Sequence, residues 1–145
     1  MPEPKDAPTP APTAAAMASA NAAVALKRVL IAEDDEEIND CLVQALVENG
    51  FEVASARDGS AALRYLGDAR FDAVILDLVM PGAGGMSVMD EVQKRGLQTP
   101  VIVISNYLGA LDRQRYVRFG AARVFSKPFS FDELVAAVRQ VTGAA

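Results

Sequence analysis

Short apolar runs alternate with segments of helical periodicity from residue 27 almost to the end of the chain, and this alternation limits the fold more than any other feature. Runs with the length and character of strands lie at residues 28–32, 51–56, 71–78, 100–105 and 123–126. RVLIA and FDAVILDL are continuously apolar, as strands covered on both faces are, whereas FEVASA alternates like an edge strand. The pattern predicts buried strands in a single sheet.

Helical spacing of apolar residues follows each of these runs. The predicted helices lie at residues 38–46, 60–66, 86–92, 108–119 and 131–141, and Asn49-Gly50 ends the first of them. Strands that alternate with helices predict an α/β fold, a parallel sheet with right-handed crossovers. We therefore expect a doubly wound five-stranded sheet of order 2-1-3-4-5 with five helices.

The first 26 residues differ in composition from the rest. They form a low-complexity Ala/Pro tract, which we interpret as a disordered or loosely helical tail because its proline-rich first half cannot be helical. The true start could be Met1 or Met17. One domain is expected over residues 27–143, since roughly 120 residues suffice for a sheet with its covering helices.

Charge and composition exclude several classes of protein. The net charge is −5, so binding of nucleic acid by charge alone is not expected. The chain has no histidine, which excludes histidine bases and histidine metal sites, and its one cysteine cannot form an internal disulfide. No run is long enough to span a membrane and no secretory signal is visible. These features predict a cytoplasmic protein without membrane contact.

Polar residues collect where four of the predicted strands end. They are Glu33, Asp34 and Asp35 after the first strand, Asp77 at the end of the third, Ser105 at the end of the fourth and Lys127 after the fifth. In the expected strand order these four strands are neighbours about 4.8 Å apart, so the side chains converge on one rim. Clustered carboxylates raise each other's pKa, and a bound divalent cation removes that conflict. Oxygen ligands suit Mg²⁺, Mn²⁺ or Ca²⁺.

Each group in this cluster has a chemical use. Asp77 can act as a nucleophile on a metal-bound phosphoryl donor. Ser105 can hydrogen-bond one phosphoryl oxygen, and Lys127 can neutralise another. A lone acidic run is more often a solvated helix start, with Asp34 or Asp35 as an ordinary N-cap. The register with Asp77 and Lys127 favours the functional interpretation.

IAEDDEE, ILDLVMPG, VIVISN and FSKPF resemble, in order and spacing, the motifs of response-regulator receiver domains. The resemblance covers about residues 27–141 and implies a flavodoxin-like receiver fold. It implies that Asp77 is the phosphoacceptor, that Ser105 moves toward the phosphoryl group and that Lys127 pairs with phosphate. It also implies a cis bond between Lys127 and Pro128.

The same resemblance implies a metal site and a set of partners. Mg²⁺, or Mn²⁺ in its place, would be held by Glu33, Asp34, Asp77 and the backbone carbonyl of Val79. The phosphoryl group would come from a sensor histidine kinase or a histidine phosphotransfer protein, and the chain would be a signalling receiver, not an enzyme beyond its own phosphorylation and dephosphorylation. A downstream protein or a second copy would bind the surface formed by the last two predicted helices and the strand between them. We expect no DNA-binding or enzymatic output domain after the last predicted helix.

Two positions depart from the family pattern. Asn106 follows the hydroxyl residue, where the family usually has Ala or Gly, and Val124 stands where an aromatic switch residue is usual. Phe125 should point to the opposite face of the sheet from Val124.

Two further features of the sequence are a cluster of arginines, with two alternative interpretations, and a single cysteine. The positive charge around the fourth helix and fifth strand is either a solvated face or a contact surface for an acidic partner or second copy; it comprises Arg113, Arg115, Arg118 and Arg123. Cys41 lies on the apolar stripe of the first helix and is expected to be a buried structural thiol.

Three other functions were weighed. A phosphatase of the haloacid-dehalogenase class needs a second Asp two residues after its nucleophile, where this chain has Val79. A flavin carrier would need a Ser/Thr/Gly phosphate loop after the first strand, where this chain has carboxylates. A pseudo-receiver that binds partners without phosphorylation stays open, because of Asn106 and Val124.

Overall fold

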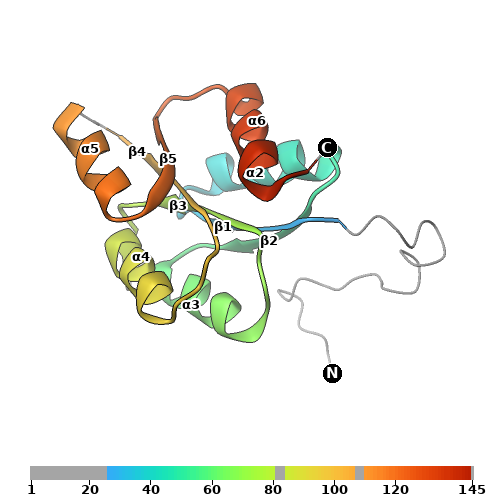
Figure 1. The fold of residues 1–145 in the computed structure, drawn as a ribbon. Coiled ribbons are helices and arrows are strands. Elements are labelled where there is room, and N and C mark those ends of the chain that lie inside the picture. Colours follow the sequence, from blue (N-terminus) through green and yellow to red (C-terminus); the bar gives the residue numbers. More distant parts are fainter. Residues whose placement is uncertain (1–25, 81–83, 107–109, 145) are drawn as a thin grey trace.

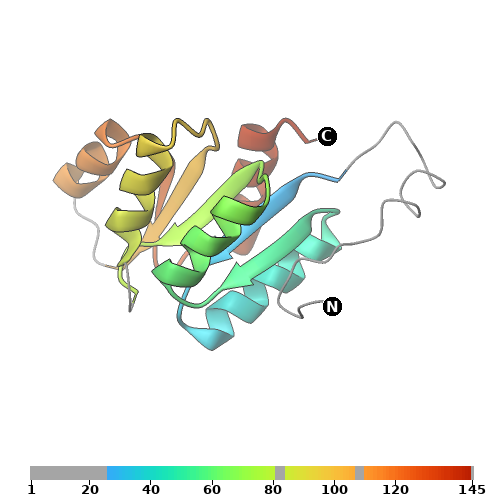
Figure 2. The same ribbon diagram turned by 90° about the horizontal axis from the view of Figure 1, so that it is seen from below.

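The computed structural model describes residues 26–80, 84–106 and 110–144, and its strands form one parallel sheet. The strands are β1 (Arg28–Ala32), β2 (Glu52–Ala56), β3 (Ala73–Asp77), β4 (Val101–Ser105) and β5 (Ala121–Ser126). They pair in the order β2-β1-β3-β4-β5 (Figure 1). The predicted α/β class and strand order are confirmed. Because all the strands point the same way, their carboxyl ends share one edge, as Figure 2 shows.

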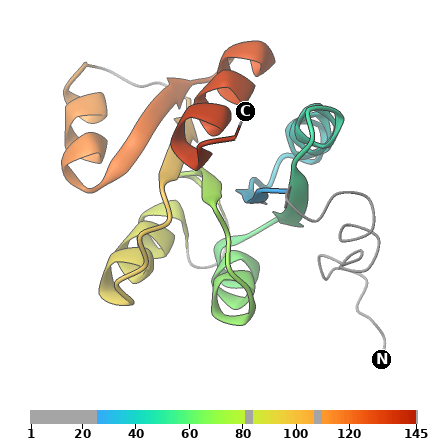
Figure 3. The same ribbon diagram turned by 45° about the vertical axis from the view of Figure 1, so that its right-hand side comes forward.

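Helices cover both faces of the sheet. They are α2 (Glu36–Glu48), α3 (Gly59–Asp68), α4 (Gly84–Lys94), α5 (Ala110–Arg118) and α6 (Phe131–Thr142). One apolar cluster joins the sheet to α2 and α6, and another joins it to α3 and α4. α5 lies at the end of the sheet, beside β5 and α4 (Figures 1 and 3).

Side chains of the central strands alternate between the two clusters. In β1, Val29 and Ile31 face the α2/α6 side, while Leu30 and Ala32 face the α3/α4 side. Every residue of β3 and of β4 is buried. A strand covered on both faces has no polar face, which is why these strands appear in the sequence as unbroken apolar runs.

The element ends follow local capping. The side chains of Asp35, Asp58 and Ser130 each accept a hydrogen bond from a backbone N–H in the first turn of α2, α3 and α6. β3 is shorter than the predicted strand 71–78, since it begins at Ala73 and ends at Asp77. β5 starts two residues before the predicted 123–126, next to a register irregularity in its pairing with β4. The first two residues of the predicted helix 108–119 lie outside the described residues.

The prediction for Cys41 was wrong: its side chain is exposed on α2. The helix turns Asn39, Leu42 and Leu46 toward the sheet, positions spaced by three and four residues. Cys41 precedes Leu42 by one residue, so it lies about 100° around the helix from that row. The prediction counted only hydrophobic residues as buried. Because the polar Asn39 is buried as well, the buried face of α2 is rotated away from Cys41.

Residues 1–25 lie outside the described part of the chain, so the tail prediction was not tested. Among the described residues, no helix is long and apolar enough to cross a membrane.

Candidate functional site

The carboxyl edge of the sheet brings together the side chains that the sequence placed there. Lys127 Nζ lies 2.9 Å from Glu33 Oε1 and 3.2 Å from Asp77 Oδ2. Glu33 is fully buried and Asp77 is 4% exposed. These groups come from three strand ends, of β1, β3 and β5, and the parallel order alone makes them neighbours.

Asp34 completes an acidic group with Glu33 and Asp77. One carboxylate oxygen from each of the three lies within 4.8 Å of the others. Glu33 Oε1 is buried and accepts no hydrogen bond of regular geometry, although Lys127 Nζ lies close to it. An incompletely satisfied buried oxygen beside two further carboxylates is a donor set that suits a hard divalent cation.

The charges in the cluster perturb one another. Burial raises the pKa of Glu33 to about 7, against the opposing effects of the Lys127 ammonium and the Asp35 N–H. Burial alone would lower the pKa of Lys127, but its close ion pair with Glu33 and the negative charge of Asp77 raise it. Lys127 is therefore held cationic between two carboxylates.

Backbone groups orient the two buried carboxylates. Glu33 Oε2 accepts from the Asp35 N–H at 3.0 Å, and Asp77 Oδ1 accepts from the Val79 N–H at 3.1 Å. Asp35, and not Asp34, caps α2, which leaves Asp34 exposed at the mouth of the site. The Val79 side chain is 75% exposed, and the role of its carbonyl as a metal ligand stays a prediction.

Ser105 lies at the same edge, at the end of β4. It is 6% exposed, and its hydroxyl donates to the neighbouring Asn106 carbonyl at 3.2 Å. The Lys127 N–H donates to the Ser105 carbonyl at 2.8 Å, which fastens the segment after β5 to the end of β4. The Lys127-Pro128 peptide is cis, as the family resemblance implied.

Sequence reasoning missed two residues that shape this edge. Asn39 is buried: its amide donates to the carbonyls of Glu33 and Ala56, and its side-chain oxygen accepts from Ser55. It ties the segment that carries the acidic pair to β2. Its signal in the sequence was an Asn at a core-facing helical position, three before Leu42.

The second missed residue is Gly85, in the first turn of α4. A Cβ at this position would collide with the Leu78 Cα and the Asp77 carbonyl oxygen, so only glycine lets α4 approach the end of β3 this closely. The Gly85 N–H donates to the Leu78 carbonyl at 3.2 Å. The Gly84-Gly85 pair was the available signal.

β5 is the edge strand next to β4, and Val124 and Phe125 follow each other along it. Val124 packs toward the α3/α4 side and Phe125 toward the α2/α6 side, which confirms that they face opposite ways. Phe125 belongs to a row of rings with Phe129 and Phe131. The arginines of the predicted basic cluster are exposed, and Arg113 also donates to the Val124 carbonyl at 2.9 Å.

Comparison with known proteins places this edge in a family context. Residues 29–139 match the response regulator receiver domain. The transcriptional regulatory protein TctD of Salmonella typhimurium is 38% identical over 112 residues, which are 77% of this chain and 50% of TctD. The transcriptional regulatory protein PrrA of Mycobacterium tuberculosis is 38% identical over 119 residues, which are 82% of this chain and 51% of PrrA. The chain spans about half the length of these relatives.

Solved structures agree with this match. The receiver domain of the Francisella response regulator 1452 has a TM-score of 0.79 and 30% identity, with 81% of this chain and 97% of that chain covered. The receiver domain of NtrX from Brucella abortus has a TM-score of 0.74 and 27% identity, with 81% and 99% covered.

Proposed function

Because the chain belongs to the response regulator receiver domain family, we propose that it is a phosphoacceptor of two-component signalling in which Asp77 receives the phosphoryl group. The observation that carries the proposal is the environment of Asp77. Its carboxylate is nearly buried, lies 3.2 Å from Lys127 Nζ and belongs to the acidic group with Glu33 and Asp34. A sensor histidine kinase or a histidine phosphotransfer protein is the proposed donor.

The transfer follows from the chemistry of these groups. An Asp77 oxygen attacks phosphorus, the bond between phosphorus and the donor imidazole breaks, and an aspartyl phosphate forms. Lys127 then pairs with a phosphoryl oxygen, and the Val79 N–H can donate to a second oxygen from its position beside Asp77. Ser105 supplies a hydroxyl donor once it turns from the Asn106 carbonyl.

The acidic group fits Mg²⁺, with Mn²⁺ as a substitute. Glu33, Asp34 and Asp77 would hold the ion, which would neutralise charge on the phosphoryl oxygens. The donor set is all oxygen, as hard divalent cations prefer, and the buried Glu33 Oε1 accepts no hydrogen bond of regular geometry.

We propose that residues 27–143 form a signalling domain. Its only chemistry would be the phosphorylation and dephosphorylation of its own Asp77. It would work in the cytoplasm, where its kinase partner would meet it. The face formed by α5, β5 and α6 is the proposed contact for a downstream protein or a second copy.

Phosphorylation with acetyl phosphate and Mg²⁺ tests the assignment. We expect intact-mass spectrometry to detect one added phosphoryl group in the wild type and none in Asp77→Asn. Asp90→Asn is the matched control, since Asp90 is an exposed α4 carboxylate paired with Lys94. An equal phosphorylated fraction in Asp77→Asn would refute the assignment. A wild type that takes up no phosphoryl group from any donor would support the pseudo-receiver alternative.

A further inference from the structure

The peptide between Glu33 and Asp34 joins two of the three carboxylates of the acidic group, so its position sets how these two carboxylates stand relative to each other. The Glu33 N–H donates to the Ala56 carbonyl at 3.0 Å, which continues the pairing of β1 with β2 by one residue. The Glu33 carbonyl, which belongs to the joining peptide, accepts from Asn39 Nδ2 at 2.9 Å. The joining peptide is therefore held by a side chain of α2.

The Asn39 amide is held in one orientation by its own partners. Its Nδ2 donates to the Ala56 carbonyl at 3.3 Å as well as to Glu33, so both of its hydrogens are used. Its Oδ1 accepts from the Ser55 hydroxyl at 2.5 Å. A reversed amide would set its oxygen against two carbonyl oxygens. The bonds thus connect β2, α2 and the start of the acidic segment in one arrangement.

Asn39 occupies a position that packing alone would give to an apolar residue. It is fully buried, and it lies on the face of α2 that also buries Leu42 and Leu46. A buried amide is costly unless all its polar atoms are paired, and a fully paired one makes its surroundings rigid. All three of the bonds that Asn39 makes here hold the end of β1 and of β2, beside the acidic group.

We propose that Asn39 is a positioning residue for the metal site. Its amide would hold the peptide between Glu33 and Asp34 so that both carboxylates reach one divalent cation. Ser55 would support this through its bond to Asn39. The inference rests on the proposed function, in which Mg²⁺ is the ion of this group. Side chains that orient the residues around a metal commonly change its affinity by about 10–100-fold.

Mg²⁺ titration followed by amide chemical shifts tests the role of Asn39. We expect the dissociation constant of Mg²⁺ to rise on the order of tenfold in Asn39→Ala. Asn39→Leu fills the site with a side chain of similar size and should show the same loss, which would assign it to the missing amide and not to a cavity. Ser55→Ala should show a smaller loss in the same direction. Circular dichroism selects a temperature at which every variant is folded.

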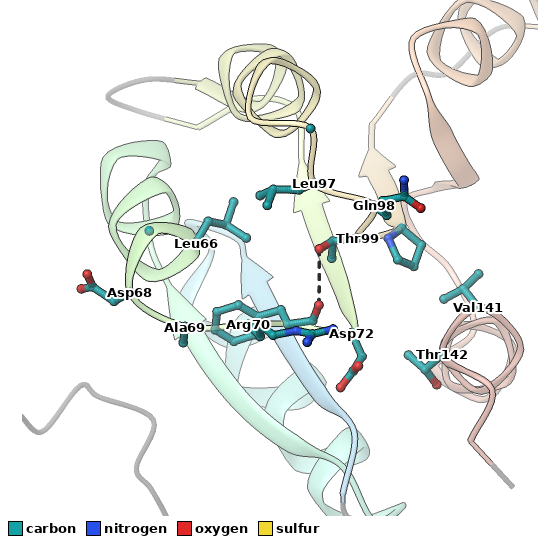
Figure 4. Close-up of a pocket in the computed structure, with 14 residues that line it drawn as sticks. Leu66, Asp68, Ala69, Arg70, Asp72, Leu97, Gln98, Thr99, Val141 and Thr142 are labelled. Carbon is teal, nitrogen blue, oxygen red and sulfur yellow. Dashed lines mark hydrogen bonds between the residues drawn. The ribbon is translucent and has the colours of Figure 1, made fainter.

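Two control variants separate positioning from general loss of stability. Leu42→Ala opens the core on the same face of α2 but removes no bond to the acidic segment. Thr99→Ala removes a bond of the same kind at the opposite edge of the sheet. There Thr99 Oγ1 donates to the Phe71 carbonyl at 3.3 Å, beside a groove of about 750 Å³ (Figure 4). The five residues of β3 separate that edge from the site by roughly 13 Å. Both controls should bind Mg²⁺ like the wild type.

The rate of phosphorylation by acetyl phosphate gives a second readout. In Asn39→Ala the Mg²⁺ concentration for half of the maximal rate should rise, while the rate at saturating Mg²⁺ stays near that of the wild type. A merely structural role would lower the rate at every Mg²⁺ concentration.

Wild-type affinity in both Asn39 variants would overturn the inference and leave the proposed function standing. An equal loss in Leu42→Ala would also overturn it, because any disturbance of α2 would then suffice. A wild type that binds no Mg²⁺ would overturn the proposed metal site together with this inference, whereas labelling of Asp77 reports on the acceptor separately.

Discussion

At the scale of single residues, the site depends on one lysine that serves two buried carboxylates. Lys127 lies within 3.2 Å of oxygens of both Glu33 and Asp77, and a third carboxylate, Asp34, joins the group. One positive charge does not balance three negative ones, so without a bound cation the most deeply buried member is the one that takes up a proton. Burial is the main cause of the raised pKa of Glu33, and the neighbouring Asp77 carboxylate adds to it.

We predict that the metal-free protein loses stability as pH rises from about 4.5 to about 7. The folded pKa of Glu33, about 7, exceeds the unfolded value of 4.5, so the folded state binds more protons in this window. The contribution of Glu33 to stability is therefore greatest below the unfolded value, falls through the window and levels off above it. The loss is on the order of 3 kcal/mol. Urea unfolding in EDTA at several pH values measures it.

Glu33→Gln should flatten this slope, because glutamine is neutral at every pH. Glu37→Gln, an exposed carboxylate in the first turn of α2, should retain it. A slope that is identical in Glu33→Gln and the wild type would contradict the predicted titration.

At the scale of elements, α5 differs from the other helices. No side chain from Leu111 to Arg118 is buried, and Leu111 and Val117 are 79% and 55% exposed. Tyr116 packs at the border of the core, and Arg113 reaches the Val124 carbonyl at 2.9 Å. A helix with so little buried surface opens at low free energy, so we expect α5 to be the element that a change at Asp77 shifts most easily.

Beryllofluoride, which imitates the aspartyl phosphate, should therefore change hydrogen exchange in α5 more than in α2. Val124 has no aromatic ring that could reorient when Ser105 moves. The effect on α5 should therefore pass through the backbone of β5, whose Val124 carbonyl accepts a hydrogen bond from Arg113. Exchange followed by mass spectrometry with and without beryllofluoride measures this. A response confined to α2 would show that the proposed output surface is wrong.

Arg113→Ala provides the structural test of the same idea. Loss of the bond to the Val124 carbonyl should speed exchange in α5 before any phosphorylation, and beryllofluoride should then add less. Arg115→Ala removes an equal charge from the exposed side of the helix and should behave like the wild type. Equal exchange in the two variants would mean that this bond does not hold α5 in place.

At the scale of the whole molecule, the sheet and the acidic edge could be predicted because both follow from position along strands. Asp77 and Lys127 lie close together because parallel strands end at one edge of the sheet. This proximity does not depend on how the connecting helices are oriented. The orientation of α2 could not be predicted in the same way. Asn39 is buried by its three hydrogen bonds and not by hydrophobicity, so the apolar pattern placed Cys41 inside when it lies outside. The contact of Gly85 with Leu78 depends on distance between elements, which periodicity does not encode.

Mg²⁺ should stabilise the whole domain, because an ion that binds only the folded state shifts the unfolding equilibrium by mass action. At a concentration tenfold above its dissociation constant the gain is about 1.4 kcal/mol. That raises the melting temperature by a few degrees in a domain of this size.

Asp34→Ala should lose most of the Mg²⁺-dependent shift, since it removes one of the three carboxylates of the group without opening the core. Glu37→Ala removes an equal charge from the same segment but lies outside the group, and it should keep the full shift. Melting curves with Mg²⁺ and with EDTA compare the three proteins. Equal shifts in Asp34→Ala and Glu37→Ala would place the ion elsewhere and would remove the metal from the proposed chemistry of Asp77.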